Sequence, residues 1–272
     1  MLALTFFDYG WIKVLEMQFG QPYFLLDTPA GSVTNFPLLV LFFGHSSAYQ
    51  IFIGLSEVIC GILLWFRRTM LPGALLSLVI MGNIVAMNFA FDISVKLHSS
   101  LYFFIALYLI LPDLPGLFKV MVGRAHRFIQ RTVMSFKRLS RRRIIQIQTL
   151  TLLGILGYGF LAQLQHQNQT HQTYELTGAW EAADRYGSPY GWQRLFIETS
   201  GRPGGPVRTM TRLFSGEAEP GIAFISETDR RLRIVINGST FSFSYELNED
   251  VLTLTETEKA RRVFNLYRKV YD

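Results

Sequence analysis

A cluster of polar side chains interrupts one of the longest apolar stretches of the chain. Asn88, Asp92 and Lys96 occur in the sequence MNFAFDISVKL, at residues 87–97, and they share one face if a helix continues through them. Because an amide, a carboxylate and an amine are costly at the edge of a bilayer, the cluster is a candidate functional site. Its donors and acceptors suit the carbonyl oxygens of a quinone or an anionic substrate. The structural alternative is that Asp92 and Lys96 form an i,i+4 ion pair or cap the turn between two helices.

A second candidate group combines a carboxylate with two glycines. Gly54, Glu57 and Gly61 fall on one helical stripe, so the glycines allow a neighbouring helix to approach while the carboxylate avoids lipid. Lys13 is the nearest partner by depth, and we expect a Lys13–Glu57 ion pair that joins two helices. Alternatively, a buried acid at this position could relay protons to a quinone headgroup.

Histidine and cysteine offer little further chemistry. His45 and His98 are both expected at the membrane interface, where two imidazoles could ligate haem iron or contact a quinone, although interfacial histidines usually have no such role. Cys60 is the single cysteine, so neither a disulfide nor a cysteine-based metal site can form within one chain. The sequence contains no metal-ligand repeat and no order of residues typical of a hydrolase, and it assigns no catalytic residue.

The composition shows which elements must position these residues. Half of the 272 residues are hydrophobic, only 17% are charged and the mean hydropathy is +0.24, which is unusual for a soluble chain of this length. A membrane-spanning helix needs about 20 apolar residues. We therefore predict a bundle of four to five transmembrane helices, in the blocks 2–19, 48–66, 71–91, 99–111 and 144–164, of which the first is the least regular because it contains Asp8, Lys13 and Glu16.

Basic residues predict the orientation of the bundle. Arg67 and Arg68 follow one apolar block, and nine Lys and Arg residues lie in the link at 119–143. The positive-inside rule places both basic regions in the cytoplasm, which agrees with the two crossings between them. The amino terminus is then cytoplasmic, whereas the loop at 21–36 and everything after residue 164 lie outside.

The basic link has an apolar side as well. Apolar residues alternate with its charges, so residues 119–143 are expected to lie as an amphipathic helix on the anionic inner leaflet, or to serve only as a topology anchor. The net charge of +6 also raises the possibility of nucleic-acid binding, but the flanking spans argue against it. We expect the lipid bilayer, and no nucleic acid, as a partner of this region.

Residues 165–272 have the pattern of a small, exported all-β domain. Asn237 and Gly238 favour a type I′ turn between alternating strands, and about seven short strands follow a polar linker at 165–173. A meander that closes into a small barrel accounts for them best. The sequence LTGAW at 176–180 resembles the Gly-x-Trp opening of lipocalin-like domains, whose Trp packs across the barrel base. An interior filled with side chains is more usual for this size than a ligand cavity.

Four sequences in the membrane half together resemble the DoxX family of bacterial membrane proteins. They are GWIKVL at 10–15, GLSEVICGILL at 54–64, RRTMLPGAL at 67–75 and MNFAFDISVKL at 87–97, and the resemblance covers about residues 4–122. It implies a compact bundle in the bacterial cytoplasmic membrane. Named members include the small subunit associated with thiosulfate:quinone oxidoreductase, so the resemblance suggests a quinone and a redox protein partner.

The sequence therefore predicts a bundle at 1–118, a basic link at 119–143, a last transmembrane helix at 144–164 and an exported β domain at 165–272. Two functional hypotheses follow. In the first, the protein is an accessory subunit of a quinone-linked redox system, with Lys13, Glu57, Asn88, Asp92 and Lys96 as its polar core. In the second, the bundle is an anchor and the β domain recognises a partner or a lipid. A small transporter is a third and weaker reading because no inverted repeat is visible.

Overall fold

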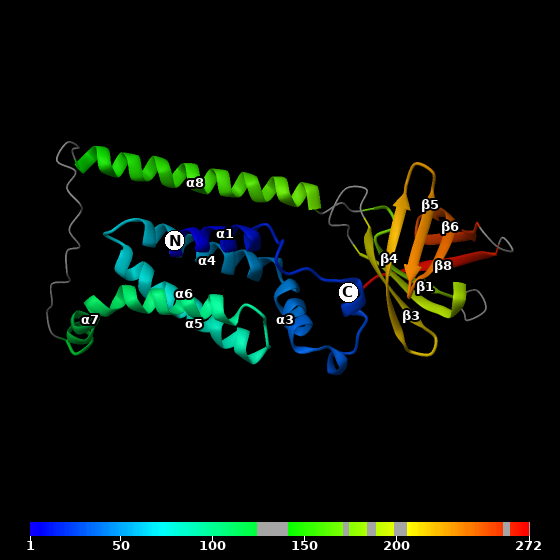
Figure 1. Cartoon of the computed structure of the whole chain (residues 1–272), viewed down its shortest axis with the longest axis horizontal. Helices are drawn as coiled ribbons and strands as arrows, with labels where there is room; N and C mark the ends of the chain where they lie inside the picture. The colour runs from blue at the N-terminus through cyan, green and yellow to red at the C-terminus, as the bar shows by residue number, and fades with distance from the viewer. Residues whose placement is uncertain (124–140, 171–173, 184–188, 199–205, 258–261, 272) are drawn as a thin grey trace. The chain divides into compact units, whose positions relative to one another are not determined.

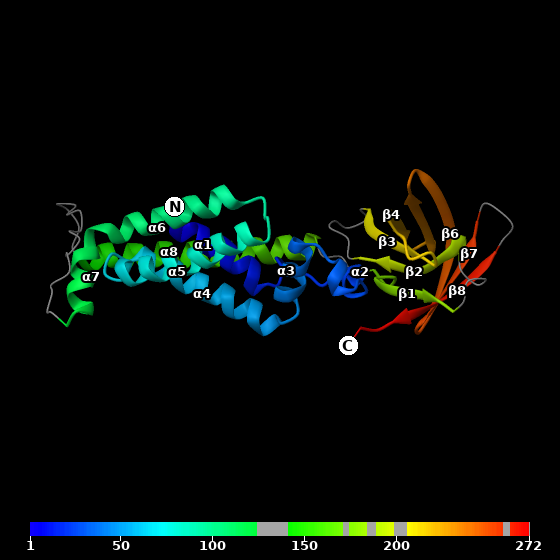
Figure 2. The same ribbon diagram turned by 90° about the horizontal axis from the view of Figure 1, so that it is seen from below.

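The computed structural model describes residues 1–123, 141–170, 174–183, 189–198, 206–257 and 262–271. The chain divides into two compact units (Figures 1 and 2). The helical unit consists of Met1–Gly20 and Thr34–Leu164, and the barrel unit consists of Gln21–Val33 and Gln165–Asp272. The barrel unit is thus built from two segments that are far apart in the sequence.

The helical unit contains four helical segments that are long and apolar enough to cross a membrane, as predicted. They are Ser47–Trp65, Met70–Ala90, Lys96–Met121 and Arg142–Asn168. Helices α4 and α5 have the bounds of the first two, and α8 extends over Arg141–Thr170. The third comprises α6 (Lys96–Ile110), a 3₁₀ turn (Leu111–Asp113) and α7 (Leu114–Met121). Pro112 and Pro115 therefore bend the helical segment rather than end it, because each occupies an early helical position where its missing N–H is tolerated.

Two predicted boundaries were wrong, and one helix was not predicted. Helix α1 spans Leu2–Val14 instead of residues 2–19, and its 13 residues extend only about 20 Å at 1.5 Å per residue. The expected polar linker at 165–173 is helical up to Thr170, because its glutamines favour helix. A further helix, α3 (Asn35–Gly44), is apolar but has ten residues, too few for a span. Most of the basic link at 119–143 lies outside the described residues, so its predicted amphipathic helix is untested.

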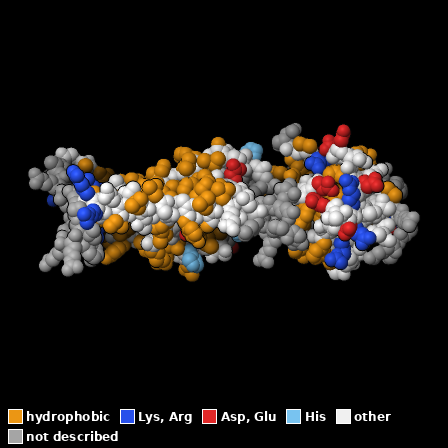
Figure 3. All heavy atoms as spheres, turned by 90° about the horizontal axis from the view of Figure 1, so that it is seen from above, with side chains coloured by type: hydrophobic (Ala, Val, Ile, Leu, Met, Phe, Trp, Pro, Cys, Tyr) orange, Lys and Arg blue, Asp and Glu red, His pale blue; other side chains and the backbone are white. Residues whose placement is uncertain are grey.

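The surface of the helical unit is apolar. Hydrophobic side chains cover a large part of its visible face in Figure 3, whereas acidic side chains and most basic ones gather on the barrel unit. Large apolar residues such as Phe52, Val79, Phe104 and Tyr108 are exposed on α4, α5 and α6. Exposed apolar area of this extent is expected for helices surrounded by lipid. The protein is therefore a candidate multi-pass membrane protein.

The barrel consists of eight strands, which close in sequence order with antiparallel pairing throughout. The strands are β1 (Gly178–Ala182), β2 (Trp192–Ile197), β3 (Val207–Leu213), β4 (Ala218–Ser226), β5 (Arg231–Ile236), β6 (Ser239–Asn248), β7 (Val251–Glu256) and β8 (Val263–Lys269). The predicted meander and barrel are confirmed, with one strand more than the seven expected. At the predicted turn, Asn237 and Gly238 have φ angles of 49° and 78°, as a type I′ turn requires.

The barrel interior is filled with side chains. One continuous core contains Trp180, Trp192, Phe243, Tyr245 and Leu254, all of them buried. The Trp180 indole N–H donates to the Leu176 carbonyl oxygen at 2.9 Å, and the Arg268 guanidinium lies 4.8 Å from the centroid of the Trp180 ring. An eight-stranded barrel is just wide enough for such a packed interior. This arrangement favours recognition by the outer surface over ligand binding inside.

The segment Gln21–Val33 contributes a short helix, α2 (Tyr23–Leu26), and a 3₁₀ turn (Ala30–Ser32) to the barrel unit. Four candidate spans separate this segment from the strands, and an even number of crossings returns the chain to the side on which it started. Gln21–Val33 and Gln165–Asp272 also pack together in one unit, which requires both segments to lie on the same side of a membrane. The two independent observations therefore agree.

Candidate functional site

The Lys13–Glu57 ion pair is present in the helical unit. Lys13 Nζ lies 2.8 Å from Glu57 Oε2, and the two side chains are 8% and 1% exposed. Lys13 also approaches the Tyr9 carbonyl oxygen one helical turn earlier. The other carboxylate oxygen, Glu57 Oε1, has no hydrogen-bond partner among the described residues. A pair buried in this way makes both charges tolerable in an apolar bundle.

Glycines bring α1 and α4 close enough for this pair to form. A Cβ atom on Gly54 would lie 2.7 Å from the Gly10 carbonyl oxygen and 2.8 Å from the Val14 nitrogen. A Cβ on Gly10 would in turn lie 2.9 Å from the Gly54 carbonyl oxygen. The predicted role of the glycine stripe is confirmed, and α1 is the helix that approaches it.

Asn88, Asp92 and Lys96 do not share one helical face, because the helix on which that expectation depended does not continue through them. Helix α5 ends at Ala90, and Asp92 adopts a left-handed conformation with φ of 53°. Asn88 is buried and its amide donates to Ser99 Oγ at 2.8 Å, whereas the Asp92 side chain is 81% exposed. The break in the helix rotates Asp92 away from Asn88.

Asp92 and Lys96 nevertheless form an ion pair in the turn between α5 and α6. The hydrogen bond from Lys96 and its positive charge lower the pKa of Asp92 below its usual value. This geometry matches the structural alternative, a pair that caps the turn. The three side chains therefore do not share one face, and their role as a quinone or anion site stays a prediction.

The two histidines are also separate. His45 follows the end of α3 and His98 lies in the first turn of α6, and both are exposed. Among the described residues, no group of three or more His, Cys, Asp or Glu side chains could hold a metal ion. Cys60 is buried and its Sγ lies 3.2 Å from Ser77 Oγ and 3.4 Å from the Gly73 carbonyl oxygen. Haem or quinone contacts by the histidines stay a prediction.

A polar site that the sequence did not reveal lies on the outer face of the barrel. The Asp27 side chain is 4% exposed and accepts hydrogen bonds from Arg194 Nη1 at 2.7 and 2.8 Å. Lys269 Nζ lies 3.2 Å from Asp27 Oδ1, and Arg212 Nε lies 3.2 Å from Oδ2. The Tyr271 hydroxyl donates to Oδ1 at 3.1 Å. One carboxylate thus binds three cations and a phenol.

The pKa values follow from this arrangement. Burial alone would raise the pKa of Asp27, but the hydrogen bonds from Arg194, Lys269 and Tyr271 and the charge of Arg194 lower it below the ordinary 3.8. Burial likewise opposes the charge on Arg194, but its carboxylate partners raise its pKa. Burial and the nearby Asp27 charge raise the pKa of Tyr271, so it remains a neutral donor. Asp27 is therefore ionised throughout the physiological pH range.

Sequence reasoning missed Asp27 because its partners lie about 170 to 240 residues away. The only local signal is an acidic residue in an otherwise uncharged loop, which does not indicate a partner. The strand register brings the cations together, since Arg194 pairs with Arg212 across β2 and β3.

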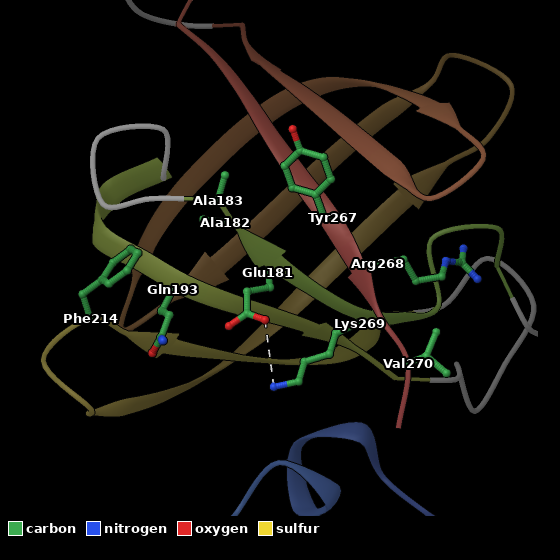
Figure 4. A pocket seen from close by; sticks show the side chains of 9 residues that line it. All are labelled: Glu181, Ala182, Ala183, Gln193, Phe214, Tyr267, Arg268, Lys269 and Val270. Carbon is green, nitrogen blue, oxygen red and sulfur yellow. Dashed lines mark ion pairs between the residues drawn. The ribbon is translucent and has the colours of Figure 1, made fainter. Parts of the chain in front are cut away.

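An open groove of about 550 Å³ borders this site on the barrel surface (Figure 4). Tyr267, Gln193 and Phe214 line it, and an ion pair joins Lys269 Nζ to Glu181 Oε2 at 3.9 Å. Tyr267 is 47% exposed, so its ring is available to a binding partner. The groove combines aromatic and polar groups, which is common in protein interfaces.

Comparison with known proteins gives one informative relative. The chain is 38% identical over 112 residues to the uncharacterized protein YwoB of Bacillus subtilis (strain 168), and the match covers 41% of this chain and 71% of YwoB. No family model matches the chain, and no solved structure matches it. On this identity and coverage, the chain belongs to the same family as YwoB.

Proposed function

We propose that the protein is a membrane-anchored binding or assembly module, whose barrel recognises a partner protein at the membrane surface. The observation that carries this proposal is the closed barrel with a filled interior, which leaves its outer surface for recognition. The helical unit then serves as the anchor, and the Lys13–Glu57 pair is part of its structure.

The charge of the barrel segment favours a protein over an anionic lipid. Residues 165–272 contain 13 Lys and Arg residues and 14 Asp and Glu residues, so this segment has no excess of positive charge. Attraction to an anionic leaflet requires a cluster of basic residues. The groove around Tyr267 and Phe214 is the part of the barrel surface best suited to such a partner, because aromatic residues are enriched in interfaces.

Site-specific photocrosslinking in native membranes tests this proposal. A photoreactive residue in place of Tyr267 is expected to give a discrete protein adduct, whereas the same residue in place of Phe224, which is exposed on β4, is not. If a partner binds the barrel, native electrophoresis of solubilised membranes should show the protein in a complex, and deletion of residues 174–272 should reduce the size of this complex by more than the mass of the deleted residues. An unchanged complex after this deletion, together with loss of the complex in Glu57→Gln, would contradict the proposal.

The second candidate is a DoxX-like accessory subunit of a quinone-linked redox system in the bacterial cytoplasmic membrane. It rests on the resemblance of the membrane half and on Glu57 Oε1, a buried acceptor without a partner among the described residues. Perturbed, buried acids are frequent at functional sites. The lipocalin-like opening at Trp180 is likewise only a resemblance.

Purification in mild detergent tests this candidate. Bound quinone in an organic extract, or a visible spectrum typical of a redox cofactor, would support it, particularly if Glu57→Gln removed the associated activity without unfolding the protein. An empty extract and a featureless spectrum would leave the binding module as the better account.

A further inference from the structure

The outer face of strand β2 is covered by the segment Gln21–Val33. Side chains alternate along a strand, so Arg194, Phe196 and Glu198 point outward at spacings of two residues. Each of them contacts the segment. Arg194 binds the Asp27 carboxylate, the Phe196 ring packs edge-on against the Phe24 ring at 5.6 Å, and Glu198 Oε1 accepts from the Phe24 backbone N–H at 3.3 Å.

The burial of Phe196 indicates that this contact is part of the folded barrel unit. Phe196 faces away from the barrel core and is nonetheless 0% exposed. An outward-facing aromatic residue is normally accessible to solvent, so its complete burial requires a cover. Phe24, which also lies 5.5 Å from the Arg212 guanidinium, contributes to that cover.

The Asp27 carboxylate compensates the repulsion between like charges on the barrel. Arg194 and Arg212 are directly opposite each other on β2 and β3, and Lys269 on β8 reaches the same carboxylate. Like charges directly opposite across a sheet are destabilising. With Asp27 between them, each cation has a carboxylate oxygen within 3.2 Å. Without it, Glu181 remains as an acidic neighbour of Arg194 and Lys269 but not of Arg212.

We propose that this face of β2, β3 and β8 is a docking surface for the protein's own segment Gln21–Val33, with Asp27 as the lock that couples the barrel to the membrane half. The chain passes between the two units at residues 20–21, 33–34 and 164–165. A docked segment therefore ties the barrel to the helical unit through three covalent connections. When the segment is undocked, the eight strands remain attached to the helical unit through the connection at residues 164–165. This coupling does not depend on what the barrel binds.

Pulsed electron paramagnetic resonance on the full-length protein in lipid nanodiscs tests the coupling. Spin labels are placed at Thr228→Cys, in an exposed barrel turn, and at Arg68→Cys, in the exposed turn before α5, with Cys60→Ala as background. The distance distribution between the labels should be narrower with Asp27 present than in its absence. It should broaden in Asp27→Asn and stay unchanged in the control Asp250→Asn, whose carboxylate is 78% exposed.

Hydrogen exchange on the same variants separates undocking from unfolding. Asp27→Asn should accelerate exchange in residues 21–33 by about tenfold or more, while strands β5 to β7 stay protected. Equally broad distance distributions in the presence and absence of Asp27 would overturn the proposal. General loss of protection in β5 to β7 would also overturn it, because Asp27 would then stabilise the barrel itself rather than lock a docked segment.

Discussion

Burial determines how much each ion pair contributes to the stability of the protein. Glu57 is 1% exposed in an apolar helical unit and depends on an ammonium group 2.8 Å away, whereas Asp92 is exposed and pairs with Lys96 in a turn. Removing one partner of a buried pair leaves an uncompensated charge, which is far more costly than losing a surface pair. The two ion pairs therefore predict different responses to the same substitution.

Lys13→Met should lower the free energy of unfolding by roughly 3 to 5 kcal/mol, because Glu57 loses its partner in the apolar interior. The double substitution Lys13→Met and Glu57→Met should recover most of this loss, since neither charge remains. Unfolding in mixed detergent and dodecyl sulfate, followed by circular dichroism, provides the measurement. Lys96→Met is the matched control and should change little; a loss as large as that of Lys13→Met would refute the distinction.

Acidification should release the segment Gln21–Val33. A lowered pKa means that ionised Asp27 stabilises the docked state fully above its unfolded value of 3.8, and that this stabilisation is lost as the pH falls below 3.8. Glu198 acts in the opposite direction, because burial raises its pKa and its protonation relieves an unfavourable charge. A spin label at Ala30→Cys should therefore remain immobilised between pH 7 and pH 5 and become mobile only at a pH below 3.8. If the segment Gln21–Val33 were released between pH 7 and pH 5, titration of a group other than Asp27 would be responsible.

At the scale of elements, close backbone contact distinguishes glycines that look alike in the sequence. Gly54 on α4 meets backbone atoms of α1, whereas nothing lies within 4 Å of a Cβ built on Gly154 of α8. Both glycines lie within apolar helices, so composition does not separate them. Their surroundings predict opposite effects of the same added methyl group.

Gly54→Ala should destabilise the helical unit by about 1 to 3 kcal/mol, because α1 must move away from α4. Gly154→Ala should be neutral or stabilising by up to about 1 kcal/mol, since alanine favours helix and meets no neighbour here. Thermal unfolding of the two variants in the same detergent compares them directly. Equal destabilisation would contradict the prediction that close contact between α1 and α4 distinguishes Gly54 from Gly154.

At the scale of the whole molecule, the number of crossings and the two segments of the barrel unit predict the sidedness of each region. Gln21–Val33 and the barrel share one side, and the turn at Arg67 and Arg68 lies on the other. The positive-inside rule assigns the second side to the cytoplasm. This orientation is a prediction from charge, separate from the folding of either unit.

Cysteine labelling in intact cells checks the orientation. In the Cys60→Ala background, a membrane-impermeant maleimide should label Ala30→Cys and Thr228→Cys from outside, after removal of any outer envelope. Arg68→Cys should react only after the membrane is permeabilised. Labelling of Ala30→Cys but not Thr228→Cys would contradict the shared side.

The sequence by itself determined the elements that depend on local pattern. Apolar blocks of membrane length, the Asn237–Gly238 turn and alternating strands predicted four to five spans and a barrel, because these signals reside in neighbouring residues. The Gly54, Glu57 and Gly61 stripe even indicated the partner Lys13, since depth in a membrane restricts the possible pairs.

Only the tertiary structure decided where the chain leaves a helix and which distant residues meet. The end of α5 before Asp92 separated a cluster that uniform helical spacing had joined. The Asp27 site depends on the register of β2 against β3 and on a loop about 170 residues away. Such contacts have no local signature, because they form only when the strands have closed and the two segments of the barrel unit have packed together.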